Sequence, residues 1–372
     1  MSKRASAGAK TTRRLFLGAA GVGAAAVAMP QVSRAQTLNW RIQSTWSPKD
    51  IFHEFVLDYA VKVNAMTGSR LKLEVLAASA VVPPFQVQDA VHAGILDGGH
   101  GVCAYWYGKH KAFSLFGTPP SFGWDAHGFL GWFYYGGGEA LYKELVNDTL
   151  KLNIVGFLYF PMPTQPLGWF NKEIKSGEDF KGTKYRTVGL STDLFKEMGA
   201  AVMILPGGDI VAAMDRGLLD GAEFNNPSSD LALGFPGVSK YFMLGSHHQP
   251  TEAFEVIFNK VKYDALPTEL RSILRYAAFA ASSDQLAKAY DRYSTDFEEI
   301  KRRGVTVVKT SEPVLNAQLA AWDRVIAAHS RDPFFKKVID SQKAWVKRTA
   351  AYLHLNNLDS NALSAAYRHF FG

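Results

Sequence analysis

Residues 180–227 read FKGTKYRTVGLSTDLFKEMGAAVMILPGGDIVAAMDRGLLDGAEFNNP. Within them, Lys184–Val188 has the pattern of a strand, and Thr192 with Asp193 begins a helix that Gly199 ends. Asp209 is expected to cap a second helix over Ile210–Arg216. A short strand, Ala222–Phe224, then runs into two asparagines and a proline. The stretch predicts strands that alternate with helices, as in an α/β sheet layer.

Two charged residues occupy the ends of those strands. Arg186 lies near the end of the first strand, and Glu223 lies where the second strand ends. In open α/β sheets, ligands bind beyond the carboxyl ends of the strands. We therefore expect Arg186 and Glu223 to face one ligand.

The rest of the chain follows the same α/β pattern and then becomes helical. Asn39–Thr45 and Leu71–Leu76 alternate polar and apolar residues, and Ile51–Met66 carries apolar residues at helical spacing. After Pro267, the expected elements are the helices Thr268–Ser282, Asp284–Arg302, Pro313–His329 and Pro333–Leu353, with one strand at Val305–Lys309. The fold class is α/β, with sheets flanked by helices and a helical C-terminal region.

Two crossings divide the chain. Ile154–Tyr159 predicts a short strand that Pro161 and Pro163 interrupt, because proline cannot stay in a central strand. Phe254–Asn259 predicts the return crossing. We expect a first domain of residues 36–160 plus 255–372, a second domain of residues 161–254, and a ligand cleft between them.

Residues 1–35 have the composition of an export signal. They contain six basic residues, no acidic residue and an apolar run from Leu15 to Met29, and Ser33-Arg34-Ala35 suits a signal peptidase. The run is too short to span a bilayer. Arg13-Arg14 resembles the twin-arginine signal for export of folded proteins. We expect cleavage near Ala35 and a periplasmic protein.

Removal of that segment changes the charge argument. The full chain carries +7, of which residues 1–35 hold six positive charges, so the remaining 337 residues carry +1. A nucleic-acid partner is therefore not expected. The single cysteine, Cys103, lies in an apolar run and is expected in the core. Residues 36–372 contain no G-x-S-x-G, H-E-x-x-H, C-x-x-C or phosphate-loop motif, which argues against an enzyme.

Several segments, taken in order, resemble the periplasmic solute-binding proteins of TRAP transporters. The similarity covers nearly the whole chain after residue 35, and the Gly-Gly-Asp-Ile version looks most like the branch that binds 2-oxo and 2-hydroxy monocarboxylates with a metal ion. The segments are Gln88–Asp97, Asn171–Ile174, Asp179–Arg186, Gly207–Ile210, Asp220–Glu223, Phe258–Lys260 and Leu266–Glu269.

The resemblance implies a two-domain clamshell that closes on an organic acid, with Arg186 holding its carboxylate. A guanidinium matches a carboxylate through two parallel hydrogen bonds, which lysine cannot reproduce. The alternative for Arg186 is a surface salt bridge. Tyr105 falls in an aromatic segment expected to line the cleft or to pack as a core strand. Asn225 either touches the ligand or makes a turn.

The resemblance also implies that Gln165, Glu223 and the main-chain carbonyl of Phe224 hold a cation, Na⁺ or Ca²⁺, which the ligand's carboxylate and 2-oxygen chelate. Hard cations prefer such oxygen ligands. Gln249 stands where a carboxylate can occur, which leaves the charge of the ion open. The alternative is that Glu223 is a hinge carboxylate and Gln165 bonds to the backbone.

The implied partners are a small organic acid, aliphatic or aromatic, and the membrane permease of the transporter. Two other functions stay open: an exported enzyme with an organic-acid substrate, and a binding protein that serves a sensor kinase. The C-terminal helices are expected to pack in the core, to brace both domains or to form a homodimer.

Overall fold

The computed structural model describes residues 37–357 and 359–371, so the predicted twin-arginine signal peptide lies outside the described residues. Leu38 begins a compact unit that contains both sheets. Among the described residues, no helix combines the length and the apolar character needed to cross a membrane.

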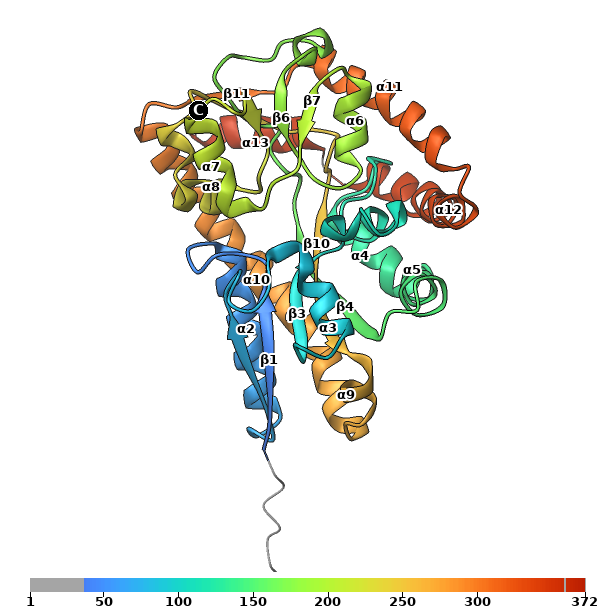
Figure 1. Ribbon diagram of the computed structural model, residues 1–372. Coiled ribbons are helices and arrows are strands. Elements are labelled where there is room, and N and C mark those ends of the chain that lie inside the picture. Colours follow the sequence, from blue (N-terminus) through green and yellow to red (C-terminus); the bar gives the residue numbers. More distant parts are fainter. Residues whose placement is uncertain (1–36, 358, 372) are drawn as a thin grey trace, which may run out of the picture. The chain divides into compact units, whose positions relative to one another are not determined.

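The first sheet has five strands in the order β2-β1-β3-β10-β4. β1, β2 and β3 run parallel, whereas β10 is antiparallel to both of its neighbours. Figure 1 shows α2 and α10 beside this sheet, and the two helices contact each other. The strands are β1 (Leu38–Ser44), β2 (Leu71–Leu76), β3 (Gly98–Val102), β4 (Ile154–Met162) and β10 (Glu252–Asn259).

The second sheet has six strands in the order β11-β9-β5-β8-β6-β7. β6 lies between β7 and β8 and is parallel to both, which brings the two ends of the 180–227 stretch side by side. The strands are β5 (Gly168–Phe170), β6 (Lys184–Arg186), β7 (Ala201–Met203), β8 (Gly221–Ala222), β9 (Tyr241–Leu244) and β11 (Thr306–Lys309).

β11 corrects one predicted domain assignment. The sequence placed all of residues 255–372 with the first sheet, but β11 pairs in parallel with β9 of the second sheet. Its half-buried Val307 and Val308 lie opposite Phe242 and Met243, so the pairing brings apolar residues of the two strands together. The division of the other segments into two domains stays a prediction.

β4 continues beyond its predicted end. The strand includes Pro161 because β4 is an edge strand, where the missing N–H of proline faces no ladder partner. The preceding residue, Phe160, has φ of 44°, and the pairing with β10 slips between Ala253 and Phe254. The crossing out of the first sheet is therefore a bulge, and Phe160 holds a backbone conformation that is uncommon for a bulky residue.

One long helix replaces two predicted ones. α10 runs unbroken over Thr268–Arg302, because the one residue between the two predicted helices, Ser283, is neither a glycine nor a proline that would end it. It contacts α2, β4 and α8. The other helices are α2 (Ile51–Met66), α3 (Val87–His92), α4 (Ala126–Tyr135), α5 (Gly138–Lys143), α6 (Ser191–Glu197), α7 (Gly207–Asp215), α8 (Pro227–Leu233), α9 (Lys260–Asp264), α11 (Glu312–His329), α12 (Pro333–Asn356) and α13 (Ser360–Phe371).

The apolar core joins the two sheets. Trp40 of β1 and Trp169 of β5 belong to one cluster of buried side chains, and the same cluster includes apolar residues of α2 and α10. Cys103 is fully buried, as predicted for a small core residue.

Candidate functional site

Arg186 and Glu223 meet at the ends of β6 and β8. The register of these parallel strands sets Arg186 opposite Ala222, and the Glu223 N–H donates to the Arg186 carbonyl at 3.2 Å. Arg186 Nη1 lies 2.9 Å from Glu223 Oε1, and the side chains are 1% and 0% exposed. The sequence had assigned these residues to separate tasks. The structure instead pairs them directly, because neighbouring strands bring adjacent register positions together.

The guanidinium of Arg186 is held on more than one side. Nε and Nη2 both donate to the Leu205 carbonyl, at 2.9 and 2.7 Å. Nη1 also donates to the Glu223 carbonyl at 3.1 Å, and the Phe224 ring lies 5.8 Å from the guanidinium carbon. One N–H of Nη2 makes no hydrogen bond to any residue in the described ranges. The group is therefore oriented before any ligand binds.

Gln165 and Gln249 lie together beside Glu223. Gln165 Nε2 donates to Glu223 Oε2 at 2.6 Å, and the Gln165 backbone N–H donates to the Gln249 carbonyl at 3.1 Å. Both side chains are buried, yet Gln165 Oε1 and both polar atoms of the Gln249 amide have no partner among the described residues. Unpaired buried polar atoms are costly, so these atoms mark a place for a ligand.

The two asparagines after Phe224 have different roles. Asn226 caps α8, because its Oδ1 accepts from the N–H groups of Ser228 and Ser229, both at 3.0 Å. The Asn225 amide nitrogen donates to the Phe224 carbonyl at 2.8 Å and to Glu252 Oε2 at 3.1 Å, in the amide orientation that suits its neighbours. Asn226 therefore makes the turn, whereas Asn225 contacts the carboxylate of Glu252.

Glu252 is the site residue that the sequence did not single out. It is the first residue of β10, it is 3% exposed, and it follows Gln249 by three positions. Burial raises the pKa of the Glu252 carboxyl group well above its ordinary range, and the negative charge of Glu223 makes a smaller contribution in the same direction. A glutamate at the start of an otherwise apolar strand was the signal that could have identified it.

Negative charge is in excess in the interior. Among residues 37–357 and 359–371, Arg186 is the only buried lysine or arginine. The buried carboxyl groups are those of Asp50, Glu223, Asp230, Glu252 and Glu255. Burial raises the pKa of Glu223 and Glu255, and it raises the pKa of Asp50 and Asp230 to about 7. Such an excess favours protons or a bound cation.

We expect the stability of the protein to fall as the pH rises from about 4 to 7, in part because of Asp50. Its folded pKa of about 7 exceeds its ordinary 3.8, so the folded state holds a proton that the unfolded state has lost in this window. Asp50→Asn keeps both hydrogen bonds, because Phe52 N–H and Ser229 Oγ both donate to Oδ1. In thermal melts, the variant should exceed the wild type at pH 8, by up to about 1.4 kcal/mol per unit of pKa shift, and the difference should shrink towards pH 4. A constant difference would contradict the assignment.

Tyr105 lies in the electrostatic environment of this site. It belongs to a 3-10 turn, Cys103–Trp106, where the sequence had favoured a strand. Burial raises the pKa of the Tyr105 hydroxyl. The charge of Arg186 lowers this pKa, whereas the charges of Glu252 and Glu223 raise it further. Its ring lies 5.8 Å from Trp46. The next residue, Trp106, is buried in the core and donates to Glu255. The aromatic segment therefore packs in the core at Trp106, and a contact of Tyr105 with the ligand stays a prediction.

The residues present also fit a cation. Within the described residues, no three His, Cys, Asp or Glu side chains come together closely enough to hold a metal ion. A cation here would therefore use amide and carbonyl oxygens as well as carboxylates. Gln165 Oε1, the Phe224 carbonyl and Glu223 supply such hard oxygen ligands, and Gln165 Oε1 has no other partner.

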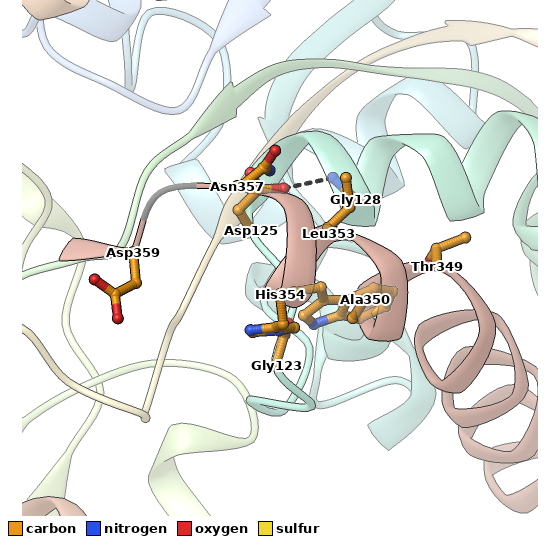
Figure 2. Close-up of a pocket in the computed structure, with 10 residues that line it drawn as sticks. Gly123, Asp125, Gly128, Thr349, Ala350, Leu353, His354, Asn357 and Asp359 are labelled. Atoms are coloured by element: carbon orange, nitrogen blue, oxygen red, sulfur yellow. Dashed lines mark hydrogen bonds between the residues drawn. The ribbon is translucent and has the colours of Figure 1, made fainter. Parts of the chain in front are cut away.

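A separate pocket lies between the start of α4 and the end of α12. Figure 2 shows Asp125, which accepts from the Gly128 N–H at 2.7 Å, and His354, which lies 2.6 Å from the Gly123 carbonyl through its Nε2. The pocket has a volume of about 190 Å³. None of the predicted ligand residues lines it, so it is distinct from the site at Arg186.

Comparison with known proteins decides the family. The model of the bacterial extracellular solute-binding proteins, family 7, matches residues 42–332. The chain belongs to this family. The family consists of transport proteins that bind solutes and is not a family of enzymes. The predicted resemblance to TRAP solute-binding proteins is confirmed, as is the predicted fold class of mixed sheets flanked by helices.

Several proteins that are similar to this chain are known by the ligands that they bind. The chain is 31% identical to a monocarboxylate 2-oxoacid-binding periplasmic protein of Nostoc, over 93% of this chain and 97% of the relative. Among solved TRAP solute-binding proteins, one from Bordetella bronchiseptica holds calcium and picolinate, with a TM-score of 0.84, 25% identity and coverage of 90% and 98% of the two chains. One from Colwellia psychrerythraea holds calcium and pyruvate, with a TM-score of 0.81, 28% identity and coverage of 90% and 100%. One from Pseudoalteromonas atlantica holds sodium and pyruvate, with a TM-score of 0.81, 28% identity and coverage of 91% and 100%.

Proposed function

We propose that this protein is the periplasmic solute-binding subunit of a TRAP transporter, that it captures a small 2-oxo or 2-hydroxy monocarboxylate together with a cation, and that it performs no chemical step. The observation that carries the proposal is the meeting of Arg186 with Glu223 and Gln165 in a buried site where amide oxygen atoms lack partners. The ligands named for relatives with calcium or sodium support the same class of solute.

Arg186 would bind the carboxylate of the solute. Its guanidinium now shares Nη1 with Glu223, so ligand binding requires that N–H groups turn from Glu223 to the solute. Glu223 then needs another positive partner, because a lone buried carboxylate is unfavourable. A cation at Gln165, Glu223 and the Phe224 carbonyl would supply that charge and would chelate the solute's carboxylate and 2-oxygen. Tyr105, Asn225 and Gln249 complete the proposed contacts.

Aromatic solutes form a second candidate class. The rings of Tyr105, Trp46 and Phe85 lie together, with centroids 5.8 Å apart for Tyr105 and Trp46 and 5.0 Å apart for Tyr105 and Phe85. Flat rings of a ligand can stack on or meet the edges of such side chains. The relative that holds picolinate supports this class.

The ligand class is tested by thermal shift of the chain from Gln36 with pyruvate, lactate, 2-oxobutyrate, benzoylformate and succinate, each with and without EDTA. A ligand that binds only the native state raises the melting temperature. We expect the monocarboxylates with a 2-oxygen to stabilise most and EDTA to reduce a Ca²⁺-dependent shift. The largest shift with succinate would contradict the proposal, as would turnover of any of these acids in the same samples.

Capture would proceed by closure of the two predicted domains, residues 36–160 with the C-terminal helices and residues 161–254. Three contacts would hold the closed form. Ser229 Oγ donates to Asp50 Oδ1 at 2.9 Å, and the Leu190 N–H donates to Ser114 Oγ at 3.1 Å. The Tyr107 hydroxyl donates to Asp193 Oδ2 at 2.5 Å. Each contact joins segments that the predicted boundary separates.

Gly189→Ala should weaken ligand binding about tenfold, because the added methyl group would oppose closure. Its Cβ would lie 2.8 Å from Ser114 Oγ and 3.0 Å from the Ala104 Cβ, and φ at this position is 63°. Gly182→Ala is the matched control, since Gly182 has φ of 71° with open space around its Cβ position. The comparison is made by calorimetric titration. An equal loss in both variants would show that backbone strain alone is responsible.

We further infer that α13 forms a homodimer contact. None of its described side chains is buried, and its apolar residues Leu363, Tyr367, Phe370 and Phe371 are 55–76% exposed. The relative from Bordetella bronchiseptica is described as a dimer. Light scattering of the chain ended before Ser360 should give half the mass of the full mature chain. Equal masses would contradict a dimer through α13.

The protein could deliver its ligand to a permease or to a sensor kinase. A capture experiment with the ligand-bound protein distinguishes the two, because it shows which of them binds.

A further inference from the structure

Glu252 differs from the other buried carboxylates in its hydrogen bonds. Asp50 accepts from two donors, and Glu255 accepts from Cys103, Trp106 and Tyr142. Asp230 accepts from Trp169 and from the N–H groups of Asn225 and Asn226. Glu252 accepts only from the Asn225 amide, and no lysine or arginine in the described ranges forms a salt bridge with it. It therefore retains oxygen lone pairs that can bind a ligand.

The position of Glu252 connects it with the candidate cation ligands. The same Asn225 nitrogen that donates to Glu252 Oε2 also donates to the Phe224 carbonyl, so one small group joins these two oxygens. Glu252, Glu223 and Arg186 are all buried, and the charge of Glu223 raises the pKa of Glu252 whereas that of Arg186 lowers it. The two N–H groups of this amide hold the Glu252 carboxyl group and the Phe224 carbonyl on either side of Asn225, and both oxygens are of the hard type that Ca²⁺ and Na⁺ prefer.

The count of charges then distinguishes monovalent from divalent ions. Arg186 offsets the charge of Glu223. A solute carboxylate adds one negative charge to the buried site, and Glu252 adds a second one when it is ionised. A monovalent ion balances only the solute, so that Glu252 keeps the proton that its raised pKa favours, whereas a divalent ion also balances an ionised Glu252 and gains it as a ligand.

We propose that Glu252 selects the charge of the cation that binds with the solute, so that this protein takes Ca²⁺ and not Na⁺. This inference rests on the proposed function. Relatives described with calcium and with sodium show that both ions occur among similar proteins, so the choice must depend on individual residues. Glu252 is the residue of this chain whose charge and free lone pairs make that choice.

The test is calorimetric titration of pyruvate into wild type and Glu252→Gln, once with Ca²⁺ and once with Na⁺ plus a calcium chelator at matched ionic strength. For wild type, we expect binding at least tenfold tighter with Ca²⁺. For Glu252→Gln, we expect the Ca²⁺ advantage to disappear or reverse. Direct titration with Ca²⁺ alone, followed by tryptophan fluorescence, should show the same loss of Ca²⁺ affinity. Glu252→Gln has nearly the same shape and is neutral, as is the protonated carboxyl group that the raised pKa of Glu252 favours, so its melting temperature without ligand should not fall.

Glu255→Gln is the matched control, because Glu255 is a buried glutamate on the same strand that bonds only to core groups. It should keep the ion preference of the wild type. A wild type that prefers Na⁺, an unchanged preference in Glu252→Gln, or an equal shift in Glu255→Gln would each overturn the inference while leaving the proposed function intact. Absence of pyruvate and of benzoylformate binding with either ion would instead show that the proposed function itself is wrong.

Discussion

Replacement of Arg186 by lysine is expected to weaken solute binding by about 2–4 kcal/mol, which corresponds to roughly 30- to 700-fold. The Leu205 carbonyl fixes the guanidinium through Nε and Nη2, and the solute is expected to take N–H groups that Glu223 holds in its absence. An ammonium group cannot reproduce these parallel hydrogen bonds. Calorimetric titration measures the change, and circular dichroism confirms that the variant is folded.

The control for this substitution is Arg70→Lys. Arg70 also makes a two-point contact with a glutamate, Glu269, but the pair lies at the surface. Surface ion pairs contribute little to stability, and Arg70 is remote from the candidate site. We expect unchanged affinity in Arg70→Lys. Wild-type affinity in Arg186→Lys would refute the carboxylate assignment.

Glu223→Gln is expected to abolish the cation dependence of binding and to reduce affinity by at least about 100-fold. The amide lacks the negative charge that would hold the cation, although it has nearly the same size. The change also removes the partner of Arg186, so the melting temperature without ligand should fall. Titrations are therefore made at low temperature, with and without EDTA. The exposed Glu269→Gln is the control.

If Glu223→Gln binds the solute with the affinity of the wild type and EDTA still weakens that binding, Glu223 is not a cation ligand. Loss of stability with unchanged affinity would instead support the alternative that Glu223 is a hinge carboxylate. These outcomes differ because a structural role lowers the melting temperature and leaves the ion dependence in place. The two measurements separate the roles in one sample.

The sequence predicted the strand ends that carry Arg186 and Glu223 better than the contacts between these residues. Strand pattern placed Arg186 and Glu223 at strand ends, and β6 and β8 end at or beside these residues. The direct ion pair was not predicted, because it depends on β6 and β8 being neighbours. Thirty-four residues, which include α6, β7 and α7, separate these strands, and periodicity within a strand does not specify its partner.

Glu252 was missed for a related reason. The sequence pointed to Gln249, three residues earlier, whereas the carboxylate that contacts Asn225 belongs to the first residue of β10. The burial of a strand end depends on the elements that pack over it, here from other parts of the chain. Local pattern predicts which face of a strand is apolar but not which polar end becomes buried.

The same limitation explains the error at β11. Its residues predict a strand, and the structure contains one at Thr306–Lys309. Its sheet was assigned from its place between C-terminal helices, but the strand pairs with β9. Conversely, β2 and α2 have the predicted bounds, because long and regular local patterns determine them.

The most direct test of the central claim compares pyruvate with propionate, which lacks the 2-oxygen, by calorimetric titration of the wild type with Ca²⁺, with Na⁺ and with EDTA. A cation that chelates the carboxylate and the 2-oxygen should make pyruvate bind about 100-fold more tightly than propionate, and EDTA without Na⁺ should remove that difference. Equal affinities for the two acids, or a preference that persists without any cation, would contradict the account.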